Sequence, residues 1–449
     1  MYSRLQASRG RLAGGDPVSL KVRTASLVLP WPGVTCPLFE SPVLHVSTGD
    51  RFPLFRLLVL AGAIFVSVSS EFLPTGLLPD IAADLNVSES RVGLLVTIFA
   101  FTVVVSTAPL TLLTRRFSRK WLLVVLLGVF AIGNVLAAVS VSYEMLAAAR
   151  VLGGLAHGLF WAVAGPYVSL LVPPTQLARA VSVTTAGGSL AFILGVPFTA
   201  AIGHAIGWRF AFATMAALVV AFAVLTIISL PALNHPVVPR TVTTATGSIV
   251  LPKRDRSIVA LGIVAVTILL VATGHNAFYT YIAPWTISVA GVPADEVSLL
   301  LLFFGIGGGV GLLIAGVFGD RYPRLTLNLS VGFVVLTIMS TALFARGLVP
   351  AIVVMMFWSM SFGGLPALFQ TRALHGASAR LRDLVGAVTA TAFNLGIAAG
   401  ALFGGIVLDH LGIEVVPWVA AAIVVLGFVW VLVTDRARIA AHPADARAG

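Results

Sequence analysis

The chain has 449 residues, of which 58% are hydrophobic and only 10% are charged. Charged residues make up about a quarter of an ordinary soluble domain, so this composition excludes that class and indicates a polytopic all-α membrane protein. The net charge of +11 does not indicate nucleic-acid binding, because the basic residues lie in short loops where they set membrane topology. The single cysteine, Cys36, offers no disulfide or metal cluster, and we expect no cofactor.

Residues 1–52 mix Arg, Ser, Gly and Pro without a sustained period, and no apolar run among them is typical of a signal peptide. We expect either a disordered cytoplasmic tail or an over-long start of the reading frame. A regulatory arm is the weaker alternative.

Twelve apolar segments follow, each long enough to cross a bilayer as a helix. We place them at 56–79, 91–113, 121–140, 143–168, 178–204, 209–230, 257–284, 295–317, 325–345, 348–370, 384–408 and 415–434. The expected parts are an N-terminal half (53–231), a cytoplasmic linker (232–256), a C-terminal half (257–434) and a C-terminal tail (435–449).

Basic residues concentrate in alternate loops. Arg115, Arg116, Arg119 and Lys120 lie between the second and third segments, and Arg372, Arg380 and Arg382 lie between the tenth and eleventh. The opposite loops carry most of the acidic residues that lie in loops. The positive-inside rule therefore predicts cytoplasmic termini and a multi-pass protein of the inner (plasma) membrane.

The two halves carry matching residues at one constant offset. Gly195 and Gly400 are 205 positions apart, and so are Pro79 and Pro284. The same offset relates Glu71 to Asn276, Gly158 to Gly363, and the loop 114–119 to the loop 319–324. A repeat of this kind predicts two pseudo-symmetric six-helix halves of like orientation, with substrate bound between them near the bilayer midplane.

Several motifs resemble the major facilitator superfamily, and within it the twelve-span drug:proton antiporters. Gly316–Arg324 (GVFGDRYPR) is similar to the superfamily signature G-x-L-x-D-R-x-G-R-K, and Thr111–Lys120 is a degenerate copy of it. Arg150–Gly158 is similar to the fourth-span motif R-x-x-x-G-x-x-x-G, and Gly195-Val-Pro197 to the fifth-span antiporter motif. By resemblance, the conformational motif residues are Arg116, Arg119, Gly195, Pro197, Gly316, Asp320, Arg321 and Arg324. In the degenerate copy Arg115 stands where the acid is expected.

Three further segments resemble the arabinose/sugar-efflux-like branch of that superfamily. They are Glu71–Pro79, His275–Pro284 and Phe393–Gly396. The resemblance covers roughly residues 55–435 and implies efflux of sugars, nucleosides or chloramphenicol-like drugs.

Three ionisable residues lie inside apolar segments of the N-terminal half. At 1.5 Å per residue, Glu71 lies about 12 Å and Arg150 about 10 Å below the outer surface, with His157 at about 21 Å. Ionisable groups at such depth are rare and usually functional, so we expect Glu71, Arg150 and His157 to couple proton movement to transport. The alternatives are a fixed Glu71–Arg150 ion pair that locates two helices, and a neutral His157 bonded to a carbonyl group.

Polar and aromatic residues in both halves are candidates for the substrate site. They are Trp161, His275, Asn276, Tyr279 and Asn394. Aromatic faces with a few polar groups suit sugars, nucleosides or flat drugs. For the aromatic residues the alternative is an interfacial belt, which we prefer for Trp285.

We therefore expect a proton-coupled efflux transporter of a small organic solute that works by alternating access. Its predicted partners are that solute, protons and membrane lipid, and we expect a monomer. Facilitated diffusion or uptake of a sugar-like solute is the first alternative, and a non-transporting membrane sensor is a distant one. The chain carries neither clustered catalytic groups nor a Walker motif, so we expect no enzymatic activity.

Overall fold

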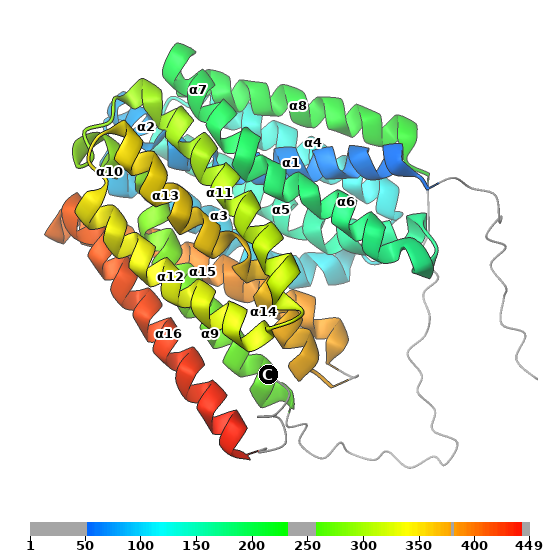
Figure 1. The fold of residues 1–449 in the computed structure, drawn as a ribbon. Helices are drawn as coiled ribbons and strands as arrows, with labels where there is room; N and C mark the ends of the chain where they lie inside the picture. The colour runs from blue at the N-terminus through cyan, green and yellow to red at the C-terminus, as the bar shows by residue number, and fades with distance from the viewer. Residues whose placement is uncertain (1–51, 232–256, 379–380, 442–449) are drawn as a thin grey trace, which may run out of the picture. The chain divides into compact units, whose positions relative to one another are not determined.

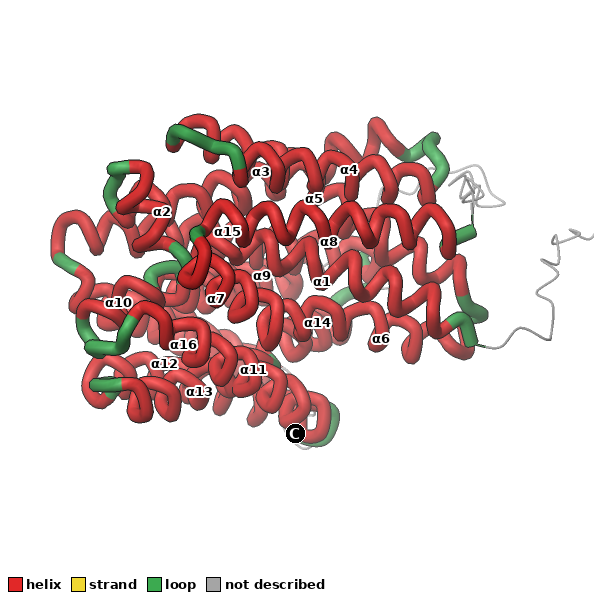
Figure 2. Tube along the Cα trace, turned by 90° about the horizontal axis from the view of Figure 1, so that it is seen from above, coloured by secondary structure: helices red, strands yellow, loops and turns green. Residues whose placement is uncertain are grey.

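A computed structural model describes residues 52–231, 257–378 and 381–441 (Figure 1). The expected tail over 1–52 (apart from Phe52), the linker 232–256 and residues 442–449 lie outside the described residues. Within the described ranges, twelve helical segments are long and apolar enough to cross a membrane. Figure 2 shows these helices joined by short loops at their ends. The predicted all-helical fold is confirmed.

The N-terminal half contains eight α-helices. They are α1 (Leu54–Gly76), α2 (Leu78–Leu85), α3 (Glu89–Thr114), α4 (Arg119–Ala138), α5 (Tyr143–Leu171), α6 (Leu177–Leu190), α7 (Val196–Ile206) and α8 (Trp208–Ser229). A π turn, Ala191–Gly195, joins α6 to α7 within one span, and a 3₁₀ turn, Pro174–Gln176, precedes α6.

The C-terminal half also contains eight α-helices in the described ranges. They are α9 (Ser257–Tyr279), α10 (Ile282–Ser288), α11 (Val297–Gly319), α12 (Pro323–Phe344), α13 (Leu348–Gly363), α14 (Leu365–Gly376), α15 (Arg382–Leu411) and α16 (Val416–Ala441). The 3₁₀ turns Ala294–Glu296 and Ile413–Val415 precede α11 and α16.

Several predicted spans are broken where the sequence places proline or glycine. The first span ends at Gly76 rather than at residue 79, and the seventh ends at Tyr279 rather than at residue 284. Pro79 and Pro284 instead lie in the first turns of α2 and α10. Proline fits the first turn of a helix but disrupts its interior, so each proline begins a new helix. The predicted helix 348–370 is likewise two helices, α13 and α14, with Gly364 between them.

Close approaches at glycine hold the first helix of each half against its neighbour. A Cβ atom at Gly195 would lie 1.8 Å from Ser69 Oγ on α1. A Cβ atom at Gly400, the repeat equivalent on α15, would lie 2.5 Å from the carbonyl oxygen of Thr273 on α9. Small residues permit such close packing of helices in membranes. The repeat predicted from the 205-residue offset is therefore present in the packing.

The halves meet through α3 and α15, and through α11 and the π turn. Thr97 on α3 donates a hydrogen bond to the carbonyl oxygen of Ala398 on α15, at 3.1 Å. A Cβ atom at Gly305 of α11 would lie 2.3 Å from the carbonyl oxygen of Phe192 in the π turn. Tyr281, between α9 and α10, fills the space opposite Gly93 of α3. These contacts join α3 and the π turn of the N-terminal half to α15, α11 and Tyr281 of the C-terminal half.

Candidate functional site

Arg150 binds the main chain of α1 where Pro74 interrupts its hydrogen bonding. Proline has no N–H group, so Pro74 cannot donate to the carbonyl oxygen of Ser70, four residues earlier. Arg150 Nη1 donates to that oxygen at 2.9 Å, and Nη2 donates to the carbonyl oxygen of Glu71 at 2.6 Å. The guanidinium group thus supplies the donor that the helix lacks at Ser70, and it lies 4.3 Å from the ring centre of Phe99.

The carboxylate of Glu71 faces His157. Glu71 Oε2 lies 3.4 Å from His157 Nε2, and the two side chains are only 7% and 6% exposed. The other ring nitrogen, Nδ1, lies 2.9 Å from Ser67 Oγ. We predicted a pairing of Glu71 with Arg150, but the hydrogen bonds from Arg150 reach only the main chain of Glu71. The group that faces the Glu71 carboxylate is the His157 imidazole.

Sequence reasoning missed four members of this cluster: Ser67, Ser70, Asn134 and Phe99. Ser70 Oγ donates to Asn134 Oδ1 at 2.6 Å, and Asn134 Nδ2 donates to the carbonyl oxygen of Phe130 at 2.8 Å. A signal was available, because Ser67, Ser70 and Glu71 are spaced i, i+3 and i+4 and therefore share one face of α1. Asn134 stands alone in an apolar span.

Trp161 lies beside the cluster, one helical turn from His157 on α5. Its side chain is 38% exposed, and its ring centre lies 6.3 Å from that of His157. The predicted residues Glu71, Arg150, His157 and Trp161 are therefore brought together. They connect a buried acid to a partly exposed aromatic side chain.

The C-terminal half holds an aromatic cluster at the equivalent place. His275 stacks on Phe362 with ring centres 3.4 Å apart, and on Tyr279 at 5.5 Å. Trp358 lies 5.1 Å from His275. His275 Nδ1 and Trp358 Nε1 are buried and have no hydrogen-bond partner among the described residues. Phe72 of α1 reaches across to Tyr279, with ring centres 6.0 Å apart.

Two predicted asparagines bond within their own helices. Asn276 Nδ2 donates to the carbonyl oxygen of Ala272 at 2.9 Å, and Asn394 Nδ2 donates to that of Ala390 at 3.0 Å. Asn394 Oδ1 has no partner among the described residues. The belt interpretation of Trp285 is wrong, because this side chain is 1% exposed and packs edge-on against Phe278 at 5.3 Å.

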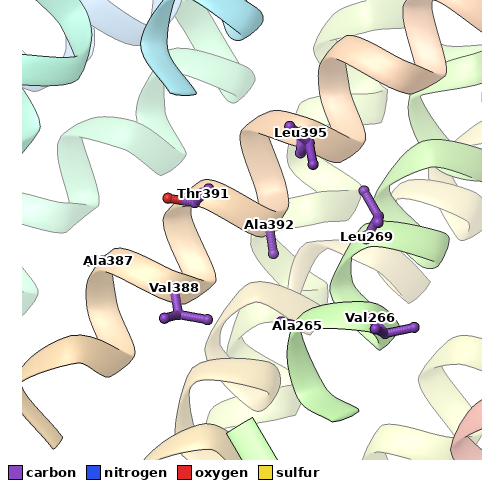
Figure 3. Close-up of a pocket in the computed structure, with 8 residues that line it drawn as sticks. All are labelled: Ala265, Val266, Leu269, Ala387, Val388, Thr391, Ala392 and Leu395. Atoms are coloured by element: carbon purple, nitrogen blue, oxygen red, sulfur yellow. The ribbon is translucent and has the colours of Figure 1, made fainter. Parts of the chain in front are cut away.

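A hollow of about 370 Å³ lies between α9 and α15 (Figure 3). Its lining is Ala265, Val266, Leu269, Ala387, Val388, Thr391, Ala392 and Leu395. Thr391 is the single polar side chain among these, so the hollow offers no charged group and is separate from the cluster around Glu71.

Comparison with known proteins decides the family. The sequence profile of the Major Facilitator Superfamily matches residues 60–401. The chain belongs to this superfamily. A "Probable sugar efflux transporter" of Mannheimia succiniciproducens is 31% identical over 392 residues, which cover 86% of this chain and 96% of the relative. A protein of the same description from Helicobacter pylori is 30% identical, covering 85% of this chain and 95% of the relative.

Solved structures share this fold. A bacterial homologue of the human lysosomal transporter Spinster, crystallised inward-facing and unoccupied, has a TM-score of 0.70 and 14% sequence identity. The match covers 86% of this chain and 98% of that chain. Fold and family together make this superfamily member a multi-pass inner-membrane transporter of the sugar-efflux-like branch.

Most of the conformational motif residues lie in or close to two turns at the ends of helices. Asp320 and Arg321 are exposed between α11 and α12, where Arg321 Nε donates to Tyr322 Oη at 3.1 Å, and Gly316 and Arg324 flank that turn. Arg116 lies in the turn between α3 and α4, and Arg119 begins α4. Gly195 ends the π turn against Ser69, and Pro197 lies in the first turn of α7.

Proposed function

We propose that this transporter exports a small sugar-like solute in exchange for protons. The family and the names of its relatives support sugar efflux, since both relatives described above are called probable sugar efflux transporters. The observation that carries proton coupling is the Glu71–His157 contact, buried inside two membrane-spanning helices.

A buried acid beside an imidazole is suited to binding a proton and releasing it again. The hydrocarbon region penalises charge, so such a pair persists only where it has a role or a compensating partner. Arg150 supplies a positive charge nearby, but its Nη atoms donate to main-chain carbonyl oxygens and not to the Glu71 carboxylate. In this proposal Glu71 binds the transported proton, His157 passes it on, and Arg150 holds α1 in place.

The aromatic cluster of the C-terminal half is the proposed wall of the substrate site. Rings of His275, Tyr279 and Trp358 present flat apolar faces, and two of them carry unpaired buried nitrogen atoms. A hydroxylated ring can pack its C–H face on such rings and pair with those nitrogens. Trp161, Asn276 and Asn394 are proposed to contribute from neighbouring helices.

Alternating access is proposed to move the halves relative to each other, with the termini in the cytoplasm. Two sets of residues are proposed to govern this movement. One is the fifth-span pair Gly195 and Pro197, and the other comprises residues in or beside two turns: Arg116, Arg119, Gly316, Asp320, Arg321 and Arg324. We propose a monomer as the working unit, because one chain supplies both halves.

The test uses the purified transporter in liposomes with a trapped pH-sensitive dye. An outward proton gradient is set, and arabinose, a galactoside, a nucleoside or chloramphenicol is added. We expect one of these solutes to trigger proton movement in the wild type, and Glu71→Gln to abolish it. Glu144→Gln is the matched control, because this carboxylate is 74% exposed at the start of α5.

Substrate flux that is independent of the pH gradient would overturn antiport and favour facilitated diffusion. Equal proton movement in Glu71→Gln and the wild type would remove Glu71 from the coupling site while leaving antiport intact.

A further inference from the structure

Ser67 departs from the usual behaviour of serine in a helix. A helical serine commonly donates to the carbonyl oxygen four residues earlier, and Ser69 does so to Phe65 at 2.7 Å. Ser67 Oγ instead lies 2.9 Å from His157 Nδ1, and Ser67 is 2% exposed. Ser67 and Glu71 are one helical turn apart, so two groups of α1 hold the two nitrogen atoms of one imidazole ring.

We propose that Ser67 is a positioning residue that links the tautomer of His157 to the protonation of Glu71. The proposal rests on the function proposed above and adds a residue to it. Ser67 can serve this purpose because its hydroxyl group can either donate or accept a hydrogen bond. A neutral imidazole has one donor and one acceptor nitrogen, so a partner that is fixed as a donor would allow only one tautomer.

The two states balance as follows. With Glu71 ionised, Nε2–H donates to the carboxylate, and Nδ1 accepts from the Ser67 hydroxyl. When a proton enters at Nδ1, the Nε2 proton passes to the Glu71 carboxylate. Glu71 then donates its new O–H to Nε2, and Nδ1–H donates to Ser67 Oγ. One proton has been gained, the imidazole is again neutral, and each of its two nitrogen atoms still has a polar partner on α1.

Few other charged groups act on this ring. The charged side chains near His157 are Glu71 from α1 and Arg150 from its own helix. The facing elements α3 and α4 present the rings of Phe99 and Phe130, at 5.3 and 6.2 Å between ring centres. Both Nη atoms of Arg150 are bonded to carbonyl oxygens, so the imidazole keeps Glu71 and Ser67 as its polar partners.

The other half lacks all three groups. Ala272, Asn276 and Phe362 occupy the repeat positions of Ser67, Glu71 and His157. A hydroxyl that served only to stabilise the fold could be kept in either half. Its presence only beside the acid and the imidazole favours a role that the three groups share.

The test is nitrogen NMR on the full-length transporter in lipid nanodiscs, labelled with ¹⁵N in its histidine rings. The His157 signals are identified by their loss in His157→Gln. We expect Nδ1 to be unprotonated at alkaline pH and protonated at acidic pH in the wild type. In Ser67→Ala the acidic form loses its acceptor for Nδ1–H, and a buried unpaired N–H is strongly disfavoured, so we expect a mixture of tautomers.

Ser67→Thr keeps the hydroxyl and is expected to restore the single acidic tautomer. Ser69→Ala is the matched control, since it removes a neighbouring hydroxyl that bonds only to its own helix. A wild-type tautomer pattern in Ser67→Ala, or an equal change in Ser69→Ala, would overturn the proposal. Proton movement in liposomes is measured separately, so loss of Glu71-dependent coupling would be distinguished from failure of the tautomer switch.

Discussion

Arg150 contacts Glu71 through the main chain, with Nη2 2.6 Å from the carbonyl oxygen of Glu71, while the carboxylate faces His157. The arginine therefore serves two purposes that sequence alone merges into one. It donates hydrogen bonds to carbonyl oxygens of α1 next to the break at Pro74. It also places a positive charge near the Glu71 carboxylate without forming a hydrogen bond to its oxygens.

Removing the two hydrogen bonds from Arg150 to the main chain of α1 should lower the stability of the fold. In Arg150→Met the carbonyl groups of Ser70 and Glu71 lose their arginine donor, at about 1–3 kcal/mol for each buried group left unpaired. We expect a clear drop in the unfolding temperature in detergent. Arg150→Lys should recover part of it, because an ammonium group can reach one carbonyl but lacks the planar fork. An unfolding temperature of Arg150→Met equal to that of the wild type would show that the Arg150 hydrogen bonds do not stabilise the fold.

His157→Phe puts at position 157 the residue type found at the equivalent position of the C-terminal half, Phe362. It removes the hydrogen bond between the imidazole and Ser67 and the 3.4 Å contact between the imidazole and the Glu71 carboxylate. Loss of an interaction with a charged group costs about 1.5–3 kcal/mol. We expect substrate-driven proton movement to slow about tenfold or more. Measured across pH, the remaining flux should no longer depend on the gradient. An unchanged pH profile would assign His157 to packing against Phe99 and Phe130.

The contact between Gly93 and Tyr281 should control how closely the halves pack at that end. A Cβ atom at Gly93 would lie 2.1 Å from Tyr281 Oη, which donates to the carbonyl oxygen of Ala401 at 2.7 Å. Overpacking of this kind costs about 1–3 kcal/mol. We expect Gly93→Ala to favour separation of α3 from α15.

Thiol labelling of Ser90→Cys in a Cys36→Ser background measures this separation. Ser90 is buried opposite Gly405, so its labelling should accelerate about tenfold, the equivalent of 1.4 kcal/mol. Gly128→Ala is the matched control, since a Cβ atom there meets nothing within 4 Å. Equal labelling in both variants would contradict the prediction.

Equivalent contacts close one end of each half, and they differ in strength. Tyr167 Oη donates to the carbonyl oxygen of Pro231 at 2.6 Å. Arg372, 205 positions after Tyr167, binds both carboxylate oxygens of Asp435, with Nη1 3.3 Å from Oδ2. The Arg372 and Asp435 side chains are 15% and 11% exposed. The C-terminal half therefore uses an ion pair where the N-terminal half uses a neutral hydrogen bond.

Breaking the ion pair should destabilise more than breaking its neutral counterpart. We expect Asp435→Asn to cost about 3 kcal/mol, because it leaves Arg372 largely buried without a counter-charge. Tyr167→Phe should cost about 1 kcal/mol. The double variant Arg372→Met/Asp435→Leu should regain most of the loss in thermal unfolding. If the double variant is no more stable than Asp435→Asn, the charge argument fails.

Much of the architecture is predictable from the sequence because lipid allows so few solutions. A spanning backbone must be either helical or part of a closed barrel, and continuous apolar runs of about 20 residues fit only the helix, so apolar length predicted the twelve spans. The family followed from short motifs, as at Gly316–Arg324. The breaks after Gly76 and Tyr279 were missed because apolar residues continue through them, so the predicted spans ran on to Pro79 and Pro284.

The site was predictable in membership but not in pairing. Depth estimates placed Glu71 and Arg150 at similar depth but His157 about 9 Å deeper, whereas the structure places His157 against the Glu71 carboxylate. Depth counted along a helix does not fix which atoms meet. The partner of Arg150 is decided by a missing N–H at Pro74, three residues beyond Glu71. Ser67 and Asn134 were passed over because single hydroxyl and amide groups are tolerated in spans when they bond to their own backbone.

The π turn at Ala191–Gly195 has no equivalent in α15, which is continuous from Arg382 to Leu411. A π turn holds about one residue more than an α turn, so the helix beyond it is rotated by about 100°. Gly195 and Gly400 still correspond, but the residues on one side of them face different directions in the two copies. The repeat therefore keeps a constant spacing in the sequence but not the same helix geometry in the two halves. Replacing the fifth span of one half by its counterpart from the other would keep the alignment and yet turn α6 or α7 away from its neighbours.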